Sequence, residues 1–116
     1  MGRIYLALFG LYCCSSAVGA ESTLTGVAIQ ALLSDKSLVA NSDGKTIEQI
    51  FQKSGLTLYL ENGAQSQGFW KVEGNTYCSQ WPPNETWSCY DVLQDCKNVT
   101  FVSKSGKRFP MEPKNK

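Results

Sequence analysis

The segment from Cys78 to Cys89 constrains this chain most strongly, because it has the pattern of a β-hairpin whose two strands can be joined by a disulfide. Its two adjacent prolines mark a turn, and a four-residue loop over 82–85 places Cys78 directly opposite Cys89. Opposed residues on antiparallel strands hold their Cβ atoms within disulfide range. We therefore predict a Cys78–Cys89 disulfide. Pairing of Cys96 with Cys78 or with Cys89 is the alternative, but neither follows from a single local geometry.

Residues 1–20 have the pattern of a secretory signal peptide. Arg3 gives a short basic start, residues 4–11 form an apolar run, and residues 17–20 are small, as a signal peptidase requires. We expect cleavage before Glu21. The mature protein is then periplasmic or secreted, where a disulfide persists.

The apolar run near the N-terminus is too short to span a bilayer, so we expect no integral membrane segment after cleavage. Two alternatives are an N-terminal membrane anchor and a lipid on Cys13 or Cys14. The lipid is the weaker of the two, because neither cysteine follows a small residue in the way that a lipidation site requires.

The charge of the mature chain is balanced, because ten basic residues face ten acidic ones once Arg3 is removed. Without a basic surplus, we expect no binding to nucleic acid. The chain has no His, which excludes His-dependent acid–base and nucleophilic catalysis. Asp91 and Asp95, the closest acidic pair, fit solvated turn residues better than a catalytic dyad. We therefore predict a non-enzyme with no catalytic residues and no cofactor.

Three cysteines remain after cleavage, namely Cys78, Cys89 and Cys96. Without a His or a fourth Cys they cannot make an ordinary structural zinc site, so we predict no metal. Within one monomer they can form one disulfide at most, and we expect Cys96 to be the cysteine left out.

The pattern of apolar residues predicts one helix followed by short strands. Leu24–Ser34 has helical spacing, and turn signals then divide the chain into strand-length segments. The expected strands are 37–41, 45–52, 56–60, 68–72, 76–81, 87–93, 99–103 and 107–111. The fold class is mainly β (α+β), an antiparallel meander of about seven or eight strands that forms a curved sheet or a small lipocalin-like barrel. We expect one β-rich domain over 21–112 and a polar tail over 113–116.

Two of these segments have patterns that say more about their structure. The segment 45–52 also fits one face of a helix. In the segment 56–60, Leu56, Leu58 and Leu60 alternate with Thr and Tyr. We expect the leucine face to be buried beneath the N-terminal helix, with Leu32 among its contacts.

Aromatic residues cluster around the hairpin and offer a candidate binding surface. Trp81, Trp87, Tyr90 and Trp70 can line a pocket or form an exposed apolar patch. The alternative is that several of them, together with Tyr77, fill the core and cover the disulfide, because so small a domain needs its aromatic residues for stability.

Several short motifs lie along the chain: Leu24-Thr-Gly26, Leu32-Leu-Ser34 with Lys36, Gly68-Phe-Trp-Lys-Val-Glu-Gly74, Tyr77-Cys78 and Trp87-Ser-Cys-Tyr-Asp-Val92. Together they resemble DUF995, a family of small exported bacterial proteins with a domain of unknown function. The resemblance covers most of residues 24–107. It implies a signal peptide, a short helix, a β-meander with a pair of cysteines, and a periplasmic location, but no known activity. Cys96 is not part of the pattern.

These features favour an exported, non-catalytic binding or accessory protein of the cell envelope, whose partner is an unknown protein or a small apolar ligand. One alternative is an inhibitor of a secreted hydrolase that uses the loop 81–87 as a wedge. Another is a small-molecule carrier that uses a barrel interior. An accessible apolar cavity would favour the carrier, and a filled interior with a protruding hairpin tip would favour the inhibitor.

Overall fold

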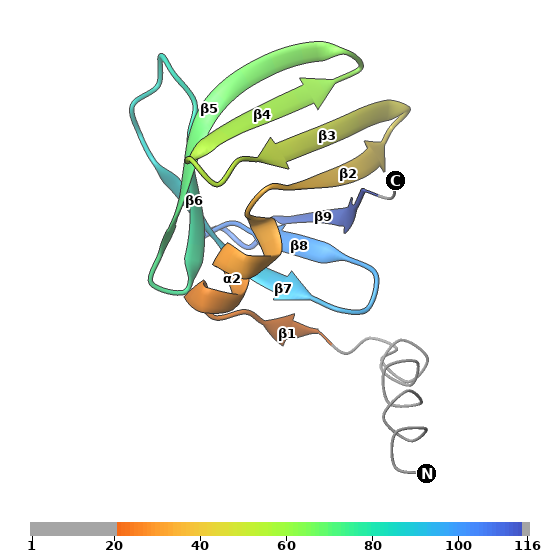
Figure 1. The fold of residues 1–116 in the computed structure, drawn as a ribbon. Helices are drawn as coiled ribbons and strands as arrows, with labels where there is room; N and C mark the ends of the chain where they lie inside the picture. The colour runs from red at the N-terminus through yellow and green to blue at the C-terminus, as the bar shows by residue number, and fades with distance from the viewer. Residues whose placement is uncertain (1–20, 115–116) are drawn as a thin grey trace.

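A computed structural model describes residues 21–114, in which eight strands form a closed antiparallel barrel and a short helix precedes them (Figure 1). The elements are β1 (Ser22–Thr23), α2 (Gly26–Leu33), β2 (Lys36–Ser42), β3 (Lys45–Phe51), β4 (Leu56–Glu61), β5 (Ala64–Glu73), β6 (Thr76–Gln80), β7 (Ser88–Gln94), β8 (Val99–Val102) and β9 (Arg108–Pro113). The predicted mainly-β barrel with an N-terminal helix is confirmed. The predicted signal peptide lies outside the described residues.

The barrel closes because each strand from β2 to β9 pairs with the next one, and β9 pairs back with β2. In an antiparallel meander the connections alternate between the two ends of the strands. The turns after β3, β5 and β7 share one end with α2, which we call the closed end. The turns after β2, β4, β6 and β8 surround the other, which we call the open end.

Helix α2 is fixed to the closed end by its first turn. Its N-cap Thr25 accepts a hydrogen bond from the backbone N–H of Ala28 (3.2 Å), which satisfies one of the donors that a helix start leaves unpaired. The N–H of Gly26 donates to Asn75 Oδ1 in the β5–β6 turn (2.7 Å). A Cβ at Gly26 would overlap with the carbonyl oxygen of Gly74, so only glycine permits this close approach.

The helix is shorter than predicted, and a strand explains the difference. The pairing of Ser22 and Thr23 with β7 continues into Leu24, whose N–H donates to the Val92 carbonyl (2.8 Å), so the helix begins at Gly26 rather than at Leu24. Within the described residues, no helix has the length and apolar character needed to cross a membrane.

At the other end of the domain, β9 runs through Pro113, and Lys114 donates its N–H to the Ser37 carbonyl (3.0 Å). The ordered pairing therefore continues into the predicted tail.

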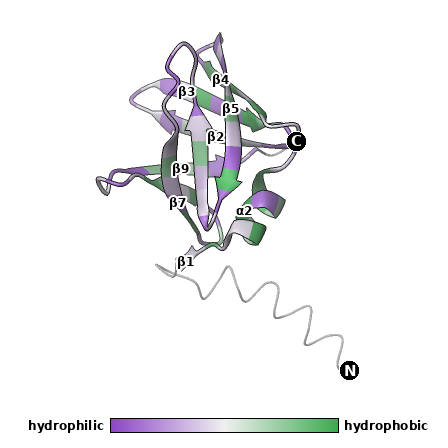
Figure 2. Cartoon of the chain, turned by 90° about the vertical axis from the view of Figure 1, so that its left-hand side faces the viewer, coloured by the Kyte–Doolittle hydropathy of each residue, from purple (hydrophilic) through white to green (hydrophobic). Residues whose placement is uncertain are grey.

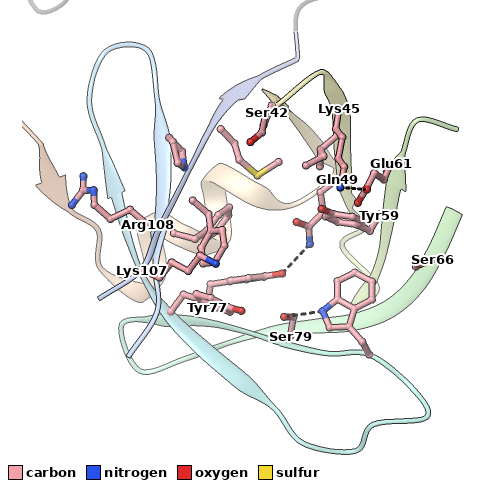
Figure 3. A pocket seen from close by; sticks show the side chains of 18 of the residues that line it. Ser42, Lys45, Gln49, Tyr59, Glu61, Ser66, Tyr77, Ser79, Lys107 and Arg108 are labelled. Carbon is pink, nitrogen blue, oxygen red and sulfur yellow. Dashed lines mark hydrogen bonds and ion pairs between the residues drawn. The ribbon is translucent and has the colours of Figure 1, made fainter. Parts of the chain in front are cut away.

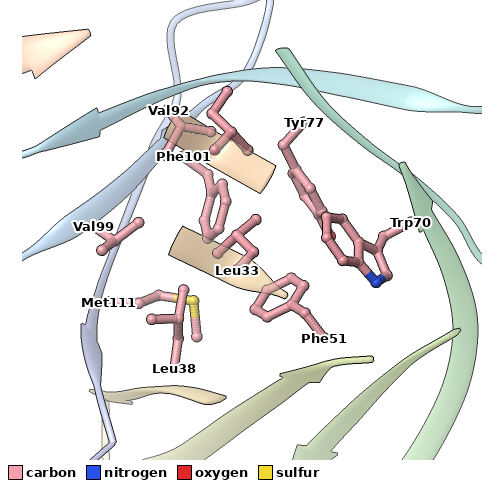
Figure 4. Packing of buried hydrophobic residues seen from close by; sticks show 10 residues of the cluster. Leu33, Leu38, Phe51, Trp70, Tyr77, Val92, Val99, Phe101 and Met111 are labelled. Atoms are coloured by element: carbon pink, nitrogen blue, oxygen red, sulfur yellow. The ribbon is translucent and has the colours of Figure 1, made fainter. Parts of the chain in front are cut away.

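A cluster of buried apolar side chains fills the closed half of the barrel (Figure 4). Ile29 and Leu33 of α2 are fully buried in it. Phe51 packs edge-on against both Trp70 and Tyr77, with ring centroids 5.7 Å apart in each pair. The indole N–H of Trp70 donates to the Gln52 carbonyl (2.7 Å), which compensates for burying a polar group.

The expectation that the Leu56, Leu58 and Leu60 face is buried under the helix is wrong. The β3–β4 register places Thr57 beside Phe51 on the inner face, where Thr57 is 0% exposed, and leaves the leucines half-buried on the outer face. The Thr57 hydroxyl donates to the Ile50 carbonyl (2.8 Å), so a small polar residue fits among the large inner rings. Figure 2 shows that hydrophobic and hydrophilic residues both occur along the strands of the barrel.

The predicted pairing of Cys78 with Cys89 and their disulfide are confirmed, but the predicted four-residue loop over 82–85 is wrong: β6 ends at Gln80 and β7 begins at Ser88, so the connection spans residues 81–87. Cys78 and Cys89 are paired across β6 and β7, with Cα atoms 4.0 Å apart, and are bonded to each other. They are 11 residues apart in sequence, and closing a loop of this size is expected to stabilise the fold by about 2–3 kcal/mol. Because the two are joined, neither is available to Cys96, which lies in the β7–β8 turn at the closed end.

Candidate ligand-binding cavity

The open half of the barrel holds a cavity of about 1140 Å³. Its wall combines aromatic rings with short polar side chains, and charged residues stand around its mouth (Figure 3). The lining residues are Ala40, Asn41, Ser42, Asp43, Lys45, Ile47, Gln49, Tyr59, Glu61, Ser66, Gln67, Tyr77, Ser79, Trp81, Pro82, Tyr90, Phe101, Lys107, Arg108, Phe109, Pro110 and Met111. All eight strands of the barrel therefore contribute to the lining. Strands β7 and β8 contribute one residue each, and every other strand contributes at least two.

A buried polar group forms the floor of the cavity, where it meets the packed core. The side-chain amide of Gln49 donates to Tyr77 Oη (3.0 Å) and to Thr57 Oγ1 (3.2 Å). Both of its N–H groups are thereby used. Its carbonyl oxygen is an acceptor that the floor can offer to a ligand.

Tyr77 separates the two halves of the interior. Its ring lies against Phe51 on the closed side and against Phe101, with centroids 4.9 Å apart. Burial raises the pKa of Tyr77 to about 12, although hydrogen bonds with Ser79 and Gln49 act in the opposite direction. The hydroxyl is therefore neutral at physiological pH, and it belongs to the hydrogen-bond network of the floor.

One side of the mouth is formed by Trp81, which follows β6. Its indole N–H donates to Ser79 Oγ (3.2 Å), and its ring stands edge-on to Tyr59 at a centroid distance of 6.0 Å. The ring also covers Gly68, where a Cβ would lie 2.6 Å from a ring atom. Glycine at position 68 thus lets the indole lie against the barrel wall.

A second aromatic wall of the cavity is formed by rings from β7, β8 and β9. Phe109 of β9 stands edge-on to Tyr90 of β7, with centroids 6.1 Å apart, and Tyr90 in turn contacts Phe101 at 6.4 Å. Phe109 is 39% exposed, an unusual position for a phenylalanine and one that places its ring at the boundary between the cavity and water.

Two of the predicted binding residues meet in this cavity and two do not. Trp81 and Tyr90 both line it. Trp70 is 4% exposed in the closed core. Trp87 lies outside the barrel, where the Lys71 ammonium stands 4.3 Å above its ring. The predicted surface is therefore divided among the cavity, the core and the outer face.

Sequence reasoning missed the residues from distant strands that complete the cavity, among them Gln49, Tyr59, Phe109 and Lys107. Alternation did place Tyr59 on the face opposite the leucines, which is the inner face. The missing information was which face of the strand points inward.

The remaining acidic and cysteine groups that could take part in catalysis or metal binding lie away from the cavity. Backbone N–H groups of Asn98 and Lys97 donate to the Asp95 carboxylate and lower its pKa, as expected for a turn residue, and Asp91 is exposed. Glu73 lies near Cys78 and Cys89 with ligand atoms within 4.8 Å of one another, but the two sulfurs are consumed by the disulfide.

Comparison with known proteins adds no assignment: the chain matches no family model, and no characterised protein or solved structure is significantly similar to it. The resemblance to DUF995 accordingly stays a prediction.

Proposed function

We propose that this chain is an exported, non-catalytic binding protein that holds a small, largely apolar molecule in the open half of its barrel. The cavity of about 1140 Å³ carries this proposal. Ligand sites in proteins are typically clefts of about 300–1,000 Å³, with mostly apolar and aromatic walls and a few polar groups that orient the ligand. Here Trp81, Tyr90 and Phe109 supply the walls, and the Gln49 carbonyl is the orienting group on the floor.

The packing of the hairpin loop favours a carrier over an inhibitor of a secreted hydrolase. An inhibitory wedge needs side chains that project into a partner. In this loop Trp81 packs back over Gly68, and Trp87 lies under Lys71, whereas the residues between them are exposed prolines and polar residues. The apolar surface of the loop is therefore already used within the molecule.

The donor set of the cavity supports binding rather than catalysis. A serine nucleophile needs a neighbouring base that can accept its proton. The Ser79 hydroxyl instead accepts a hydrogen bond from the Trp81 indole N–H, which cannot act as a base. Of the two acidic residues that line the cavity, Glu61 is paired with Lys45, and Asp43 is exposed in the β2–β3 turn.

Export to the periplasm or outside the cell is part of the proposal. It rests on the signal-like pattern of residues 1–20 and on the resemblance to DUF995. The Cys78–Cys89 disulfide supports it, because such bonds persist in oxidising compartments.

A titration with the neutral probe N-phenyl-1-naphthylamine, whose fluorescence rises in apolar surroundings, tests the proposed function. We expect saturable binding to one site. Ala40 lines the cavity and its neighbour Val39 does not, so Ala40→Phe should fill the site and weaken binding at least about tenfold. Val39→Phe, the same side chain on the outer face of β2, should bind as the native chain does. Absence of saturable binding, or equal effects of the two variants, would contradict the proposal.

A further inference from the structure

We propose that the cavity selects an amphipathic organic anion, with its apolar body inside the barrel and its carboxylate or sulfonate group bound by Lys107 at the open end. This inference rests on the proposed function, because it names the chemical class of the molecule that the same cavity holds. Its basis is the distribution of charge around the mouth.

Two of the three cations at the mouth are already neutralised within the protein. Lys45 Nζ lies 3.4 Å from a Glu61 carboxylate oxygen, and both residues line the cavity. Arg108 donates to Glu21 Oε2 at 2.6 Å. In Figure 3 the Arg108 guanidinium points away from the labelled residues of the cavity, in keeping with this outside partner. Neither group therefore offers an unpaired charge to a ligand.

Lys107 differs from both, because it forms no ion pair with any residue between 21 and 114. Its ammonium lies 5.3 Å from the centroid of the Phe109 ring. That ring lines the cavity and forms an aromatic wall with Tyr90. An ammonium beside an apolar wall is suited to an amphipathic anion, since the ligand places its apolar part on the rings while its head group meets the charge.

One acidic residue of the lining, Asp43, also lacks an ion pair among the described residues. It lies in the tight β2–β3 turn with φ of 52° and is exposed to solvent. Lys107 is exposed as well, so water and salt screen both charges. We expect the lysine to have the larger effect on an anion, because its ammonium lies beside the Phe109 ring that borders the cavity, whereas Asp43 lies in the β2–β3 turn.

Two probes with the same apolar body test the inference. N-phenyl-1-naphthylamine is neutral, and 8-anilino-1-naphthalenesulfonate carries one sulfonate on the same anilinonaphthalene framework. We expect Lys107→Gln to weaken binding of the sulfonate about three- to tenfold and to weaken binding of the neutral probe much less. Raising NaCl from about 20 mM to about 500 mM should weaken sulfonate binding to the native chain alone. Lys104→Gln is the matched control, since Lys104 lies in the same turn but does not line this cavity.

The outcomes separate this inference from the proposed function. If Lys107→Gln affects both probes equally or neither, or if Lys104→Gln has the same effect as Lys107→Gln, the anion selectivity is overturned while binding in the cavity stands. If neither probe binds the native chain, the proposed function fails and this inference fails with it.

Discussion

The two halves of this barrel are built from the same strands but differ in what fills them. At the closed end, α2 inserts Ile29 and Leu33, and the interior is packed without access to water. At the open end no helix formed by residues 21–114 covers the strands, and rings such as Phe109 border a cavity. A single strand serves both halves: β3 supplies Phe51 to the core and, two residues earlier, Gln49 to the cavity floor. The packed core and the cavity are therefore separated along the strands rather than between barrel faces.

The small size of the helix explains why the interior is divided. Helix α2 has 8 residues, which corresponds to a length of about 12 Å. It is fixed at its start to the β5–β6 turn and can fill one end of the barrel only. Tyr77 marks the boundary, since it packs on Phe51 and also lines the cavity.

The largest difference between the halves should appear in stability. Phe51→Ala removes a fully buried ring that contacts Trp70 and Tyr77, and we expect the free energy of unfolding to fall by about 3–5 kcal/mol. Tyr59→Ala removes a half-buried ring from the cavity wall and should cost about 1–2 kcal/mol. Urea unfolding monitored by circular dichroism measures both values. Equal losses would mean that the open half is packed as tightly as the closed half.

A smaller effect should appear at alkaline pH, through the tyrosine at the boundary. Burial raises the pKa of Tyr77 from 10.0 to about 12 in the folded chain. Between these values the unfolded chain loses the proton first, so the free energy of unfolding should fall as the pH rises above 10. The total loss should reach about 3 kcal/mol, since a tenfold change in an ionisation constant corresponds to about 1.4 kcal/mol.

Unfolding experiments at a series of pH values, on the native chain and on Tyr77→Phe, isolate this contribution. All other titratable groups are common to the two chains, so the difference between their profiles reports Tyr77. Parallel pH profiles would show that the hydroxyl is open to water and that the cavity extends deeper than the structure indicates.

The smallest effect concerns the outer face of the barrel. Leu58→Ala should lower the free energy of unfolding by about 1 kcal/mol, because the side chain is half-buried and its removal opens no enclosed space. Denaturant unfolding alongside Phe51→Ala provides the comparison. A loss as large as that of Phe51→Ala would show that the leucines, rather than Thr57, face the core.

The sequence allowed the meander and the hairpin register to be predicted, because both depend on neighbouring residues. Turn signals separated the strands, and the loop length placed Cys78 opposite Cys89. Which face of each strand points into the barrel depends on closure of the barrel, and closure brings together strands that are distant in sequence. The alternation over Leu56–Leu60 therefore identified the two faces of the strand, but the prediction that the leucine face points inward was wrong.

The cavity could be predicted only in part, for the same reason. The hairpin aromatics Trp81 and Tyr90 were candidates because they lie close in sequence. Gln49 and Phe109 come from strands that meet the hairpin only in the closed barrel, and no local pattern connects them.

The indole N–H signals of the three tryptophans test the division of the interior most directly. Trp81 lines the cavity, Trp70 donates to the Gln52 carbonyl in the closed half, and Trp87 lies outside the barrel. A ¹⁵N-resolved titration with N-phenyl-1-naphthylamine records all three signals at once. We expect the Trp81 signal to shift in a saturable way while those of Trp70 and Trp87 stay in place. A shift at Trp70 or Trp87 with Trp81 unchanged would contradict the account that one half of the barrel is packed and the other binds.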